Sequence, residues 1–113
     1  MMHKDKRGII LDLLVGKDWA LTFITFNDRA VRGNHFHKKT VQWDFILWGK
    51  LFGAFGKRKR LMTTFSFVKI AKNRPHAYYA RKWSMMLSFT KGVRVGENYE
   101  EDTFRLTEKE KLL

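Results

Sequence analysis

The feature of this chain that most constrains its fold is the alternation of side chains with a period of two residues. Residues 21–26 read Leu-Thr-Phe-Ile-Thr-Phe, and residues 43–48 read Trp-Asp-Phe-Ile-Leu-Trp. Such runs, rich in β-branched and aromatic residues, are typical of β-strands. Turn-forming pairs at Gly49-Lys50 and Gly56-Lys57 and the sole proline, Pro75, separate the runs. We therefore predict strands over residues 9–14, 21–26, 43–48, 51–55, 61–68, 77–80 and 83–89.

The even spacing of these short runs predicts an all-β sandwich or barrel. No stretch before residue 97 has an apolar stripe of helical period, and only the polar C-terminal tail from about residue 97 is open to helix, arm or disorder. A chain of 113 residues has room for one compact domain, residues 1–113. Function is therefore expected on or inside a single core.

The charge balance and the lack of cysteine narrow the possible partners. The chain has 23 Lys and Arg against 11 Asp and Glu, a net charge of +12, which favours anionic partners. Without cysteine there is no disulfide, thiolate zinc site or cysteine nucleophile. The apolar run at residues 8–11 ends at Asp12, too early for a signal peptide, and no run approaches the roughly 20 residues of a membrane-spanning helix. We expect a cytoplasmic protein with no membrane partner.

Residues with reactive side chains concentrate in residues 32–42, Arg-Gly-Asn-His-Phe-His-Lys-Lys-Thr-Val-Gln. On a strand, His35 and His37 point to the same face, so they can converge on one metal ion, proton or substrate atom. Histidine has an ordinary pKa of ~6.5 and can accept and return a proton near neutral pH. This pair is therefore the leading candidate for catalysis.

The spacing of the histidines resembles the cupin superfamily. Four residues separate His37 from Gln42, six more precede Gly49, and His76 follows much later after a turn. Cupins carry two histidines, a carboxylate and a glycine at these spacings, and a second motif that supplies a third histidine. The resemblance implies a cupin-type jelly-roll β-barrel, also called a double-stranded β-helix. Gln42 stands where metal-binding cupins usually have glutamate.

A narrower resemblance concerns the pattern Arg-Gly-x-His-x-His-Lys followed by glutamine. It is similar to the sugar-nucleotide branch of cupins, the 3,4-ketoisomerases and 3,5-epimerases of dTDP-linked 4-keto-6-deoxyhexoses. Residues 5–9, Asp-Lys-Arg-Gly-Ile, are similar to the Asp-x-Arg-Gly stretch that opens many of those enzymes. The resemblance implies a homodimer in which one of the paired histidines exchanges a proton beside a ketone, usually with no metal.

These considerations predict an isomerase or epimerase of a nucleotide-linked keto-sugar that needs no cofactor. The catalytic candidates are His35 and His37. The candidates for binding the small anionic substrate can bind a phosphate or carboxylate, hydrogen-bond to a sugar, or act as an acid. They are Arg7, Arg32, Lys38, Gln42 and Tyr78.

Two alternatives stay open. In the first, an oxygenase or small-molecule-binding cupin holds one divalent transition metal, Zn, Fe, Ni, Mn or Cu, with His35, His37, His76 and Gln42 as a weak fourth ligand. In the second, a non-enzymatic module binds a sugar, or binds nucleic acid through the basic cluster at residues 57–60. The simpler interpretation of that cluster is a solvated hairpin tip.

Overall fold

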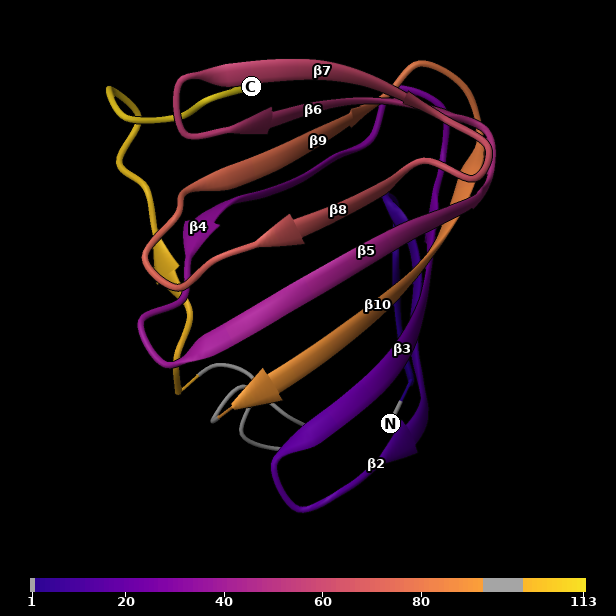
Figure 1. Cartoon of the computed structure of the whole chain (residues 1–113). Helices are drawn as coiled ribbons and strands as arrows, with labels where there is room; N and C mark the ends of the chain where they lie inside the picture. The colour runs from indigo at the N-terminus through magenta and orange to yellow at the C-terminus, as the bar shows by residue number, and fades with distance from the viewer. Residues whose placement is uncertain (1, 93–100) are drawn as a thin grey trace.

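The computed structural model of the chain is described for residues 2–92 and 101–113 (Figure 1). Over these residues the secondary structure consists of β-strands alone. The strands are β1 Met2–Asp5, β2 Gly8–Val15, β3 Trp19–Phe26, β4 Val31–Phe36, β5 Thr40–Trp48, β6 Lys50–Phe55, β7 Arg58–Thr63, β8 Phe67–Ile70, β9 His76–Ala80, β10 Ser84–Gly92 and β11 Phe104–Arg105.

The strands form two antiparallel sheets between which the chain passes repeatedly. The six-stranded sheet has the order β1-β2-β3-β10-β5-β8, and the five-stranded sheet has the order β11-β4-β9-β6-β7. Most successive strands from β3 onward therefore lie in opposite sheets, as Figure 1 shows for β4, β5 and β6. This arrangement is a jelly-roll β-barrel, so the predicted all-β fold class is confirmed.

The core lies between the inner faces of the two sheets. Its side chains come from both sheets, because the period-two pattern turns every second residue of each strand inward. The large apolar side chains with the smallest exposure are Phe26, Ile46, Leu51, Met62, Ile70 and Met86.

The predicted strand over residues 61–68 is wrong. The structure divides this segment between β7 and β8, which belong to different sheets. The break lies at Phe65, which has a φ of 70° and whose N–H donates to the carbonyl of Ile46. The first three residues of β7 are Arg58, Lys59 and Arg60, so the basic cluster runs along an exposed strand and is not only a hairpin tip.

The sequence predicts a C-terminal tail from about residue 97 that is helix, arm or disorder. Residues 97–100 of this tail lie outside the described residues. From residue 101 onward the tail packs against the barrel. β11 pairs with β4, and the side chain of Asn34 bonds to the backbone of Leu112 and Leu113. Within the described residues no helix has the length and apolar character to cross a membrane.

Candidate functional site

A bulge in β4 places the first histidine of the site. Gly33 has a φ of 95° and Asn34 a φ of 57°, and between Gly33 and His35 the register against β9 shifts. A Cβ at Gly33 would lie 2.8 Å from the carbonyl oxygen of His76, closer than real Cβ contacts allow. The shift brings His35 directly opposite His76 across the two strands.

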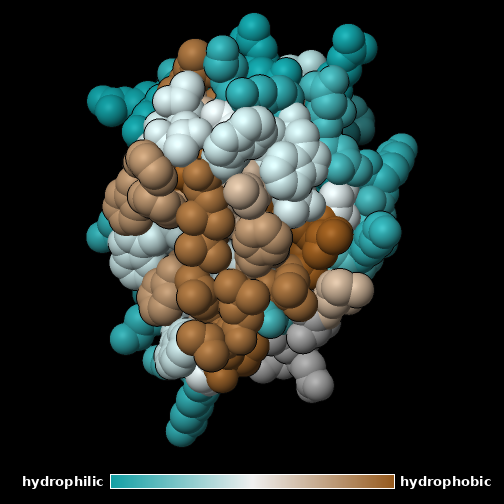
Figure 2. Space-filling model, turned by 90° about the vertical axis from the view of Figure 1, so that its right-hand side faces the viewer, coloured by the Kyte–Doolittle hydropathy of each residue, from teal (hydrophilic) through white to brown (hydrophobic). Residues whose placement is uncertain are grey.

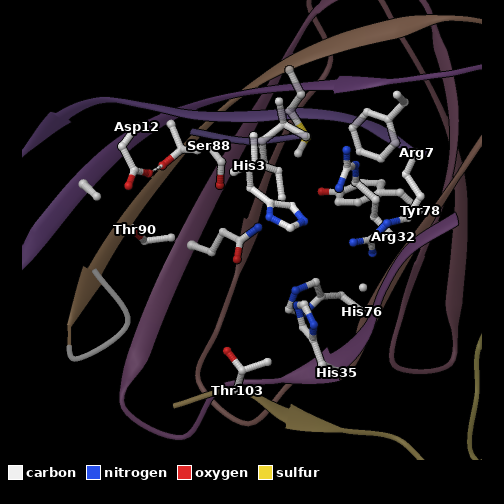
Figure 3. Close-up of a pocket in the computed structure, with 18 of the residues that line it drawn as sticks. His3, Arg7, Asp12, Arg32, His35, His76, Tyr78, Ser88, Thr90 and Thr103 are labelled. Atoms are coloured by element: carbon white, nitrogen blue, oxygen red, sulfur yellow. Dashed lines mark hydrogen bonds between the residues drawn. The ribbon is translucent and has the colours of Figure 1, made fainter. Parts of the chain in front are cut away.

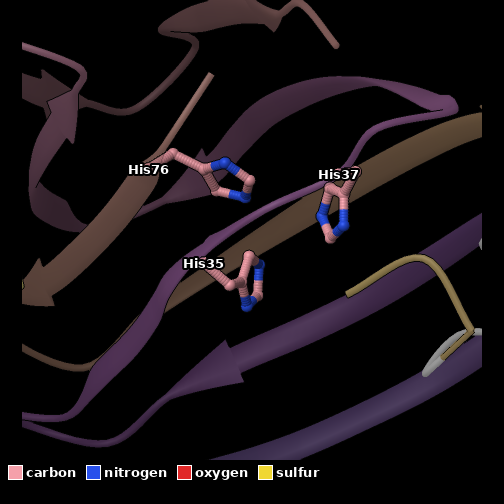
Figure 4. A group of neighbouring side chains, drawn as sticks. All are labelled: His35, His37 and His76. Atoms are coloured by element: carbon pink, nitrogen blue, oxygen red, sulfur yellow. The ribbon is translucent and has the colours of Figure 1, made fainter. Parts of the chain in front are cut away.

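Three histidines converge at this point (Figure 4). The ring centroids are 4.7 Å apart for His35 and His76, 4.8 Å for His35 and His37, and 5.2 Å for His37 and His76. One side-chain nitrogen from each lies within 4.8 Å of the others. β4 ends at Phe36, so His37 reaches the cluster from the turn after the strand and not by strand alternation.

Two of the imidazoles are oriented by main-chain carbonyl groups. His37 Nδ1 lies 2.8 Å from the carbonyl oxygen of Asp102, and His76 Nδ1 lies 3.1 Å from that of Arg74. A carbonyl only accepts, so each Nδ1 carries the hydrogen and donates it. The neutral ring then keeps its lone pair on Nε2, the arrangement that protein metal ligands commonly have.

A cavity of about 160 Å³ lies beside the histidine cluster (Figure 3). It lies between the two sheets. The apolar part of its lining includes Ile10, Ile24, Phe26 and Met86. The polar part includes most of the predicted site residues. These are Arg7, Arg32, His35, Gln42, His76 and Tyr78.

Arg32 supplies a buried positive charge to this cavity. Its side chain is 7% exposed, lies over the Phe26 ring at 5.4 Å, and donates from Nη2 to the carbonyl of Thr25 at 3.1 Å. Within residues 2–92 and 101–113, Nε and Nη1 have no hydrogen-bond partner. Burial, together with the charge of Arg7, lowers the pKa of Arg32 to about 10, so it stays charged at neutral pH. Its two remaining donor groups suit an anionic ligand.

Arg7 differs because its charge is already paired. Its Nη2 lies 2.6 Å from Asp5 Oδ2, and its Nε lies 3.0 Å from the same oxygen. The side-chain hydrogen bond from Arg7 holds the pKa of Asp5 well below its usual value. Arg7 therefore lines the cavity as one partner of an ion pair, and Arg32 is the stronger candidate for an anion.

Gln42 and Tyr78 share a buried carboxylate. Asp44 is fully buried and accepts from Gln42 Nε2 at 3.0 and 2.9 Å, and the Tyr78 hydroxyl donates a short hydrogen bond to Asp44 Oδ2. Burial, and then the charge of Asp44, raises the pKa of Tyr78 well above its ordinary value. Tyr78 is therefore a hydrogen-bond donor and not a base. With Nε2 turned to Asp44, the buried Gln42 Oε1 has no partner among the described residues.

The structure does not bring Lys38 to the cavity. Its Nζ lies 4.3 Å from the centre of the Phe104 ring, on β11. The turn that carries it is held by Asp102, whose carboxylate accepts from the backbone N–H groups of Lys38 and Lys39 and from the Thr40 hydroxyl. Asp102 also orients His37 through its carbonyl. Sequence reasoning missed Asp102, because no spacing rule connects it to residues more than sixty positions earlier.

Comparisons with known proteins agree with this geometry at the level of the fold. No protein-family model and no curated protein matches the sequence. Among solved structures, KdgF from Halomonas sp. is 14% identical with a TM-score of 0.76, and the match covers 81% of this chain and 87% of KdgF. The capsular polysaccharide assembling protein CapF from Staphylococcus aureus is 15% identical with a TM-score of 0.78, covering 94% of this chain and 34% of CapF.

A variant of oxalate decarboxylase from Bacillus subtilis is 18% identical with a TM-score of 0.75, covering 94% of this chain and 30% of that protein. All three proteins are built on the cupin jelly roll. The chain has the cupin fold. Its cupin barrel thus spans about a third of the length of CapF and of the decarboxylase. Cupin-fold neighbours of the chain include enzymes.

The donor set of the three histidines fits a divalent transition metal. Imidazole nitrogen suits Zn, Cu, Fe and Ni. With a metal–nitrogen distance of about 2.1 Å and tetrahedral angles, the nitrogen ligands of one ion lie about 3.4 Å apart. The three histidine nitrogens lie within 4.8 Å of one another, so the rings would have to turn toward the ion to hold it. Gln42 supplies a neutral oxygen where metal-binding cupins usually have a carboxylate.

Proposed function

We propose that this protein is a cupin enzyme that isomerises or epimerises an anionic keto-sugar at a three-histidine metal centre. The observation that supports the proposal is the cluster of His35, His37 and His76 at a cavity that also holds the buried charge of Arg32. The cluster provides a site for reaction, and the arginine provides a site for substrate charge.

The roles of the residues follow from their contacts. His35, His37 and His76 would hold one divalent ion, which when bound polarises a substrate carbonyl as a Lewis acid. Arg32 donates hydrogen bonds to the anionic group from Nε and Nη1. Gln42, whose amide nitrogen is held by Asp44, presents its Oε1 to a sugar hydroxyl. The proton taken from the carbon beside the ketone needs an acceptor that is not a metal ligand, and His3, which also lines the cavity, can accept and return it.

The substrate class is supported by the charge and by the motif. A net charge of +12 favours a ligand that carries phosphate groups. The Arg-Gly-x-His-x-His-Lys pattern is similar to that of cupins that act on nucleotide-linked keto-sugars. The likeness to a protein named for capsular polysaccharide assembly points the same way.

A second candidate function is isomerisation of the same substrate class without a metal. Gln42 favours it, because a neutral amide is a weaker metal ligand than the usual glutamate. In this case His37 and His76 keep a lone pair on Nε2, and His35 and His76 both line the cavity, so the proton acceptor comes from these imidazoles.

Metal analysis of the untagged protein distinguishes the two candidates. The protein is incubated with Zn, Ni, Fe, Mn or Cu, dialysed, and assayed for metal per chain as wild type, His37→Ala, His76→Ala and the control His3→Ala. The control removes the fourth histidine, His3, which lies on β1 and lines the cavity but is not one of the three clustered ligands. We expect near-stoichiometric metal in wild type and in His3→Ala, and loss of it in the two cluster variants.

Wild-type protein that retains none of these metals would contradict the metal centre and leave the second candidate. That candidate is then tested by incubating the protein with nucleotide-linked 4-keto-6-deoxyhexoses in D₂O and following deuterium incorporation beside the ketone by NMR. Exchange in wild type that disappears in His35→Ala and His37→Ala supports proton transfer by histidine. Absence of exchange in the metal-loaded and the metal-free protein would contradict both candidates.

A further inference from the structure

The inner face of the six-stranded sheet carries a row of polar side chains. Asp12 on β2 lies opposite Thr22 on β3, which in turn lies opposite Ser88 on β10. Ser88 lies opposite Asp44 on β5. Residues directly opposite one another on paired strands point to the same face of the sheet, with Cβ atoms about 5 Å apart. The row therefore crosses four neighbouring strands inside the barrel.

Most of this row belongs to the wall of the cavity. Asp12, Thr22 and Ser88 line the cavity, and so does Thr90, two residues after Ser88 on the same face of β10. Ser88 and Thr90 are each 3% exposed. The outside of the molecule is instead hydrophobic over a broad area, as Figure 2 shows on the side where β2 and β3 run in Figure 1. A sheet that turns hydroxyl and carboxylate groups inward needs hydrogen-bond partners for them there.

Asp12 differs from Asp44 because one of its two carboxylate oxygens has no partner. Asp12 Oδ1 accepts a hydrogen bond of 2.9 Å from the Thr22 hydroxyl, which orients the carboxylate. Asp12 Oδ2 is buried and has no hydrogen-bond partner among residues 2–92 and 101–113. An ionised carboxylate only accepts hydrogen bonds, and a buried polar atom without a partner destabilises the folded chain. Asp12 Oδ2 is therefore suited to a donor that a ligand brings into the cavity.

Asp12 lies across the cavity from the buried charge of Arg32. Arg32 Nη2 donates to the carbonyl of Thr25, whereas Asp12 accepts from Thr22, three residues earlier on the same strand. With a rise of about 3.3 Å per residue, these two points of β3 are about 10 Å apart. Figure 3 shows Asp12 and Thr90 on the opposite side of the cavity from Arg32. A ligand that reaches both groups has a hydrogen-bond donor at one end and an anionic group at the other.

The size of the cavity and the chemistry of its wall restrict this ligand. Pockets that enclose a drug-sized ligand measure roughly 300–1,000 Å³. The cavity measures about 160 Å³, which suits one sugar ring with its anionic group better than an entire nucleotide-linked sugar. The hydroxyl groups of Ser88 and Thr90 both donate and accept, as sugar hydroxyls do, whereas an ammonium group only donates. One carboxylate and two hydroxyls therefore match a ring that carries several hydroxyl groups.

We propose that Asp12, Ser88 and Thr90 form a subsite that binds the hydroxyl groups of a sugar ring while Arg32 binds the anionic group of the same molecule. The subsite rests on the proposed function, since its ligand is the same anionic sugar. Asp12 Oδ2 accepts from one ring hydroxyl, and the hydroxyls of Ser88 and Thr90 bond to its neighbours. A ring that lacks the first hydroxyl leaves Oδ2 buried and unpaired, so the subsite selects among sugars.

The binding of two phosphate esters of equal charge tests this subsite. Isothermal titration calorimetry compares glucose 1-phosphate, whose ring carries hydroxyl groups, with methyl phosphate, which has none. We expect wild type to bind glucose 1-phosphate at least about tenfold more tightly, because one hydrogen bond to a charged group changes a dissociation constant by about that factor. Asp12→Ala is expected to lose most of this preference, and Thr90→Val part of it.

Asp18→Ala is the matched control. Asp18 is exposed in the turn between β2 and β3 and is not among the residues that line the cavity, and its replacement changes the net charge as Asp12→Ala does. We expect Asp18→Ala to keep the preference of wild type. Circular dichroism checks that each variant folds. If Asp12→Ala fails to fold, Thr90→Val decides the question, because valine keeps the shape of threonine and removes only the hydroxyl.

The outcomes separate the subsite from the proposed function. Equal binding of both esters by wild type, or an unchanged preference in the folded variant that decides the question, would overturn the subsite and leave the anion site at Arg32 intact. Wild type that binds neither ester would contradict that anion site and the proposed function. Saturation-transfer NMR with neutral methyl glucoside, which needs no arginine, then decides the subsite. Transfer in wild type that Asp12→Ala abolishes would support it, and absence of transfer would overturn it.

Discussion

Replacement of Tyr78 by phenylalanine tests whether the buried carboxylate of Asp44 organises the site. The substitution removes one hydroxyl, which donates to Asp44 Oδ2 in the interior. A hydrogen bond to a charged group contributes about 1.5–3 kcal/mol, so we expect the free energy of unfolding to fall by about 2 kcal/mol at pH 8. The neighbouring Tyr79→Phe is the matched control. Tyr79 is half-buried and faces the other side of β9, so its change is expected to cost less than about 0.5 kcal/mol.

The same pair predicts a dependence on pH. Burial, and secondly the charge of Asp44, raises the pKa of Tyr78 well above its ordinary value. In the unfolded chain the phenol titrates near its ordinary pKa of about 10. Above that pH the unfolded state releases a proton that the folded state keeps, so wild-type stability falls by up to about 1.4 kcal/mol per pH unit. Tyr78→Phe has no such proton, and its deficit relative to wild type shrinks from about pH 10 upward.

The assay is urea unfolding followed by tryptophan fluorescence, at pH 8, 9, 10, 10.5 and 11, for wild type, Tyr78→Phe and Tyr79→Phe. Equal stability of the two variants at pH 8 would refute the role of the Asp44 hydrogen bond. A deficit of Tyr78→Phe that stays constant from pH 8 to 11, with every protein folded, would refute the titration argument.

Two other substitutions address charge. Arg32→Lys is expected to weaken the binding of a nucleoside diphosphate at least tenfold, because lysine lacks the forked donors of the buried guanidinium. The same change at the ion-paired Arg7 is expected to have a smaller effect, and isothermal titration calorimetry measures both. Asp102→Asn is expected to lose about 1–3 kcal/mol at pH 7. Although burial raises the pKa of Asp102, hydrogen bonds from the backbone N–H of Lys39, the Thr40 hydroxyl and the backbone N–H of Lys38 lower it below the ordinary value. The stabilisation is thus present above about pH 4 and lost as the pH falls further, which urea unfolding from pH 3 to 7 measures; an equal deficit at pH 3 and pH 7 would contradict it.

The strands were predictable from sequence because burial imposes the period-two pattern directly. Phe23 and Phe45 face outward and Ile24 and Ile46 face inward, so both faces of the central strands are apolar and the strand signal is strong. The prediction of one strand over residues 61–68 was wrong because apolar residues continue through the turn that divides the segment. Only the left-handed backbone at Phe65 ends β7, and a phenylalanine gives no sign of that conformation in sequence.

The candidate site was predictable to the extent that it depends on local spacing. The glycines at Gly33 and Gly49 follow from the backbone of one bulged strand and one tight turn. The short interval between His35 and His37 keeps the two rings close, although His37 lies beyond the end of the strand. At Gly49, with a φ of 122°, a Cβ would lie 2.2 Å from Ser84 Oγ, so no other residue fits. Contacts between distant segments carry no such signal. The bond from His37 to Asp102 spans 65 positions and depends on how the tail packs.

The glutamine at position 42 is explained by the carboxylate at position 44. The two residues alternate on β5 to the same inner face, and their side chains bond inside the barrel. A glutamate at 42 would set a second negative charge against the buried Asp44, at a cost that rises as the dielectric constant falls. The amide removes that repulsion, satisfies Asp44 through its nitrogen and leaves its oxygen without a partner among the described residues. The carboxylate of this strand thus stands at Asp44, two residues after Gln42, where it also accepts a hydrogen bond from Tyr78.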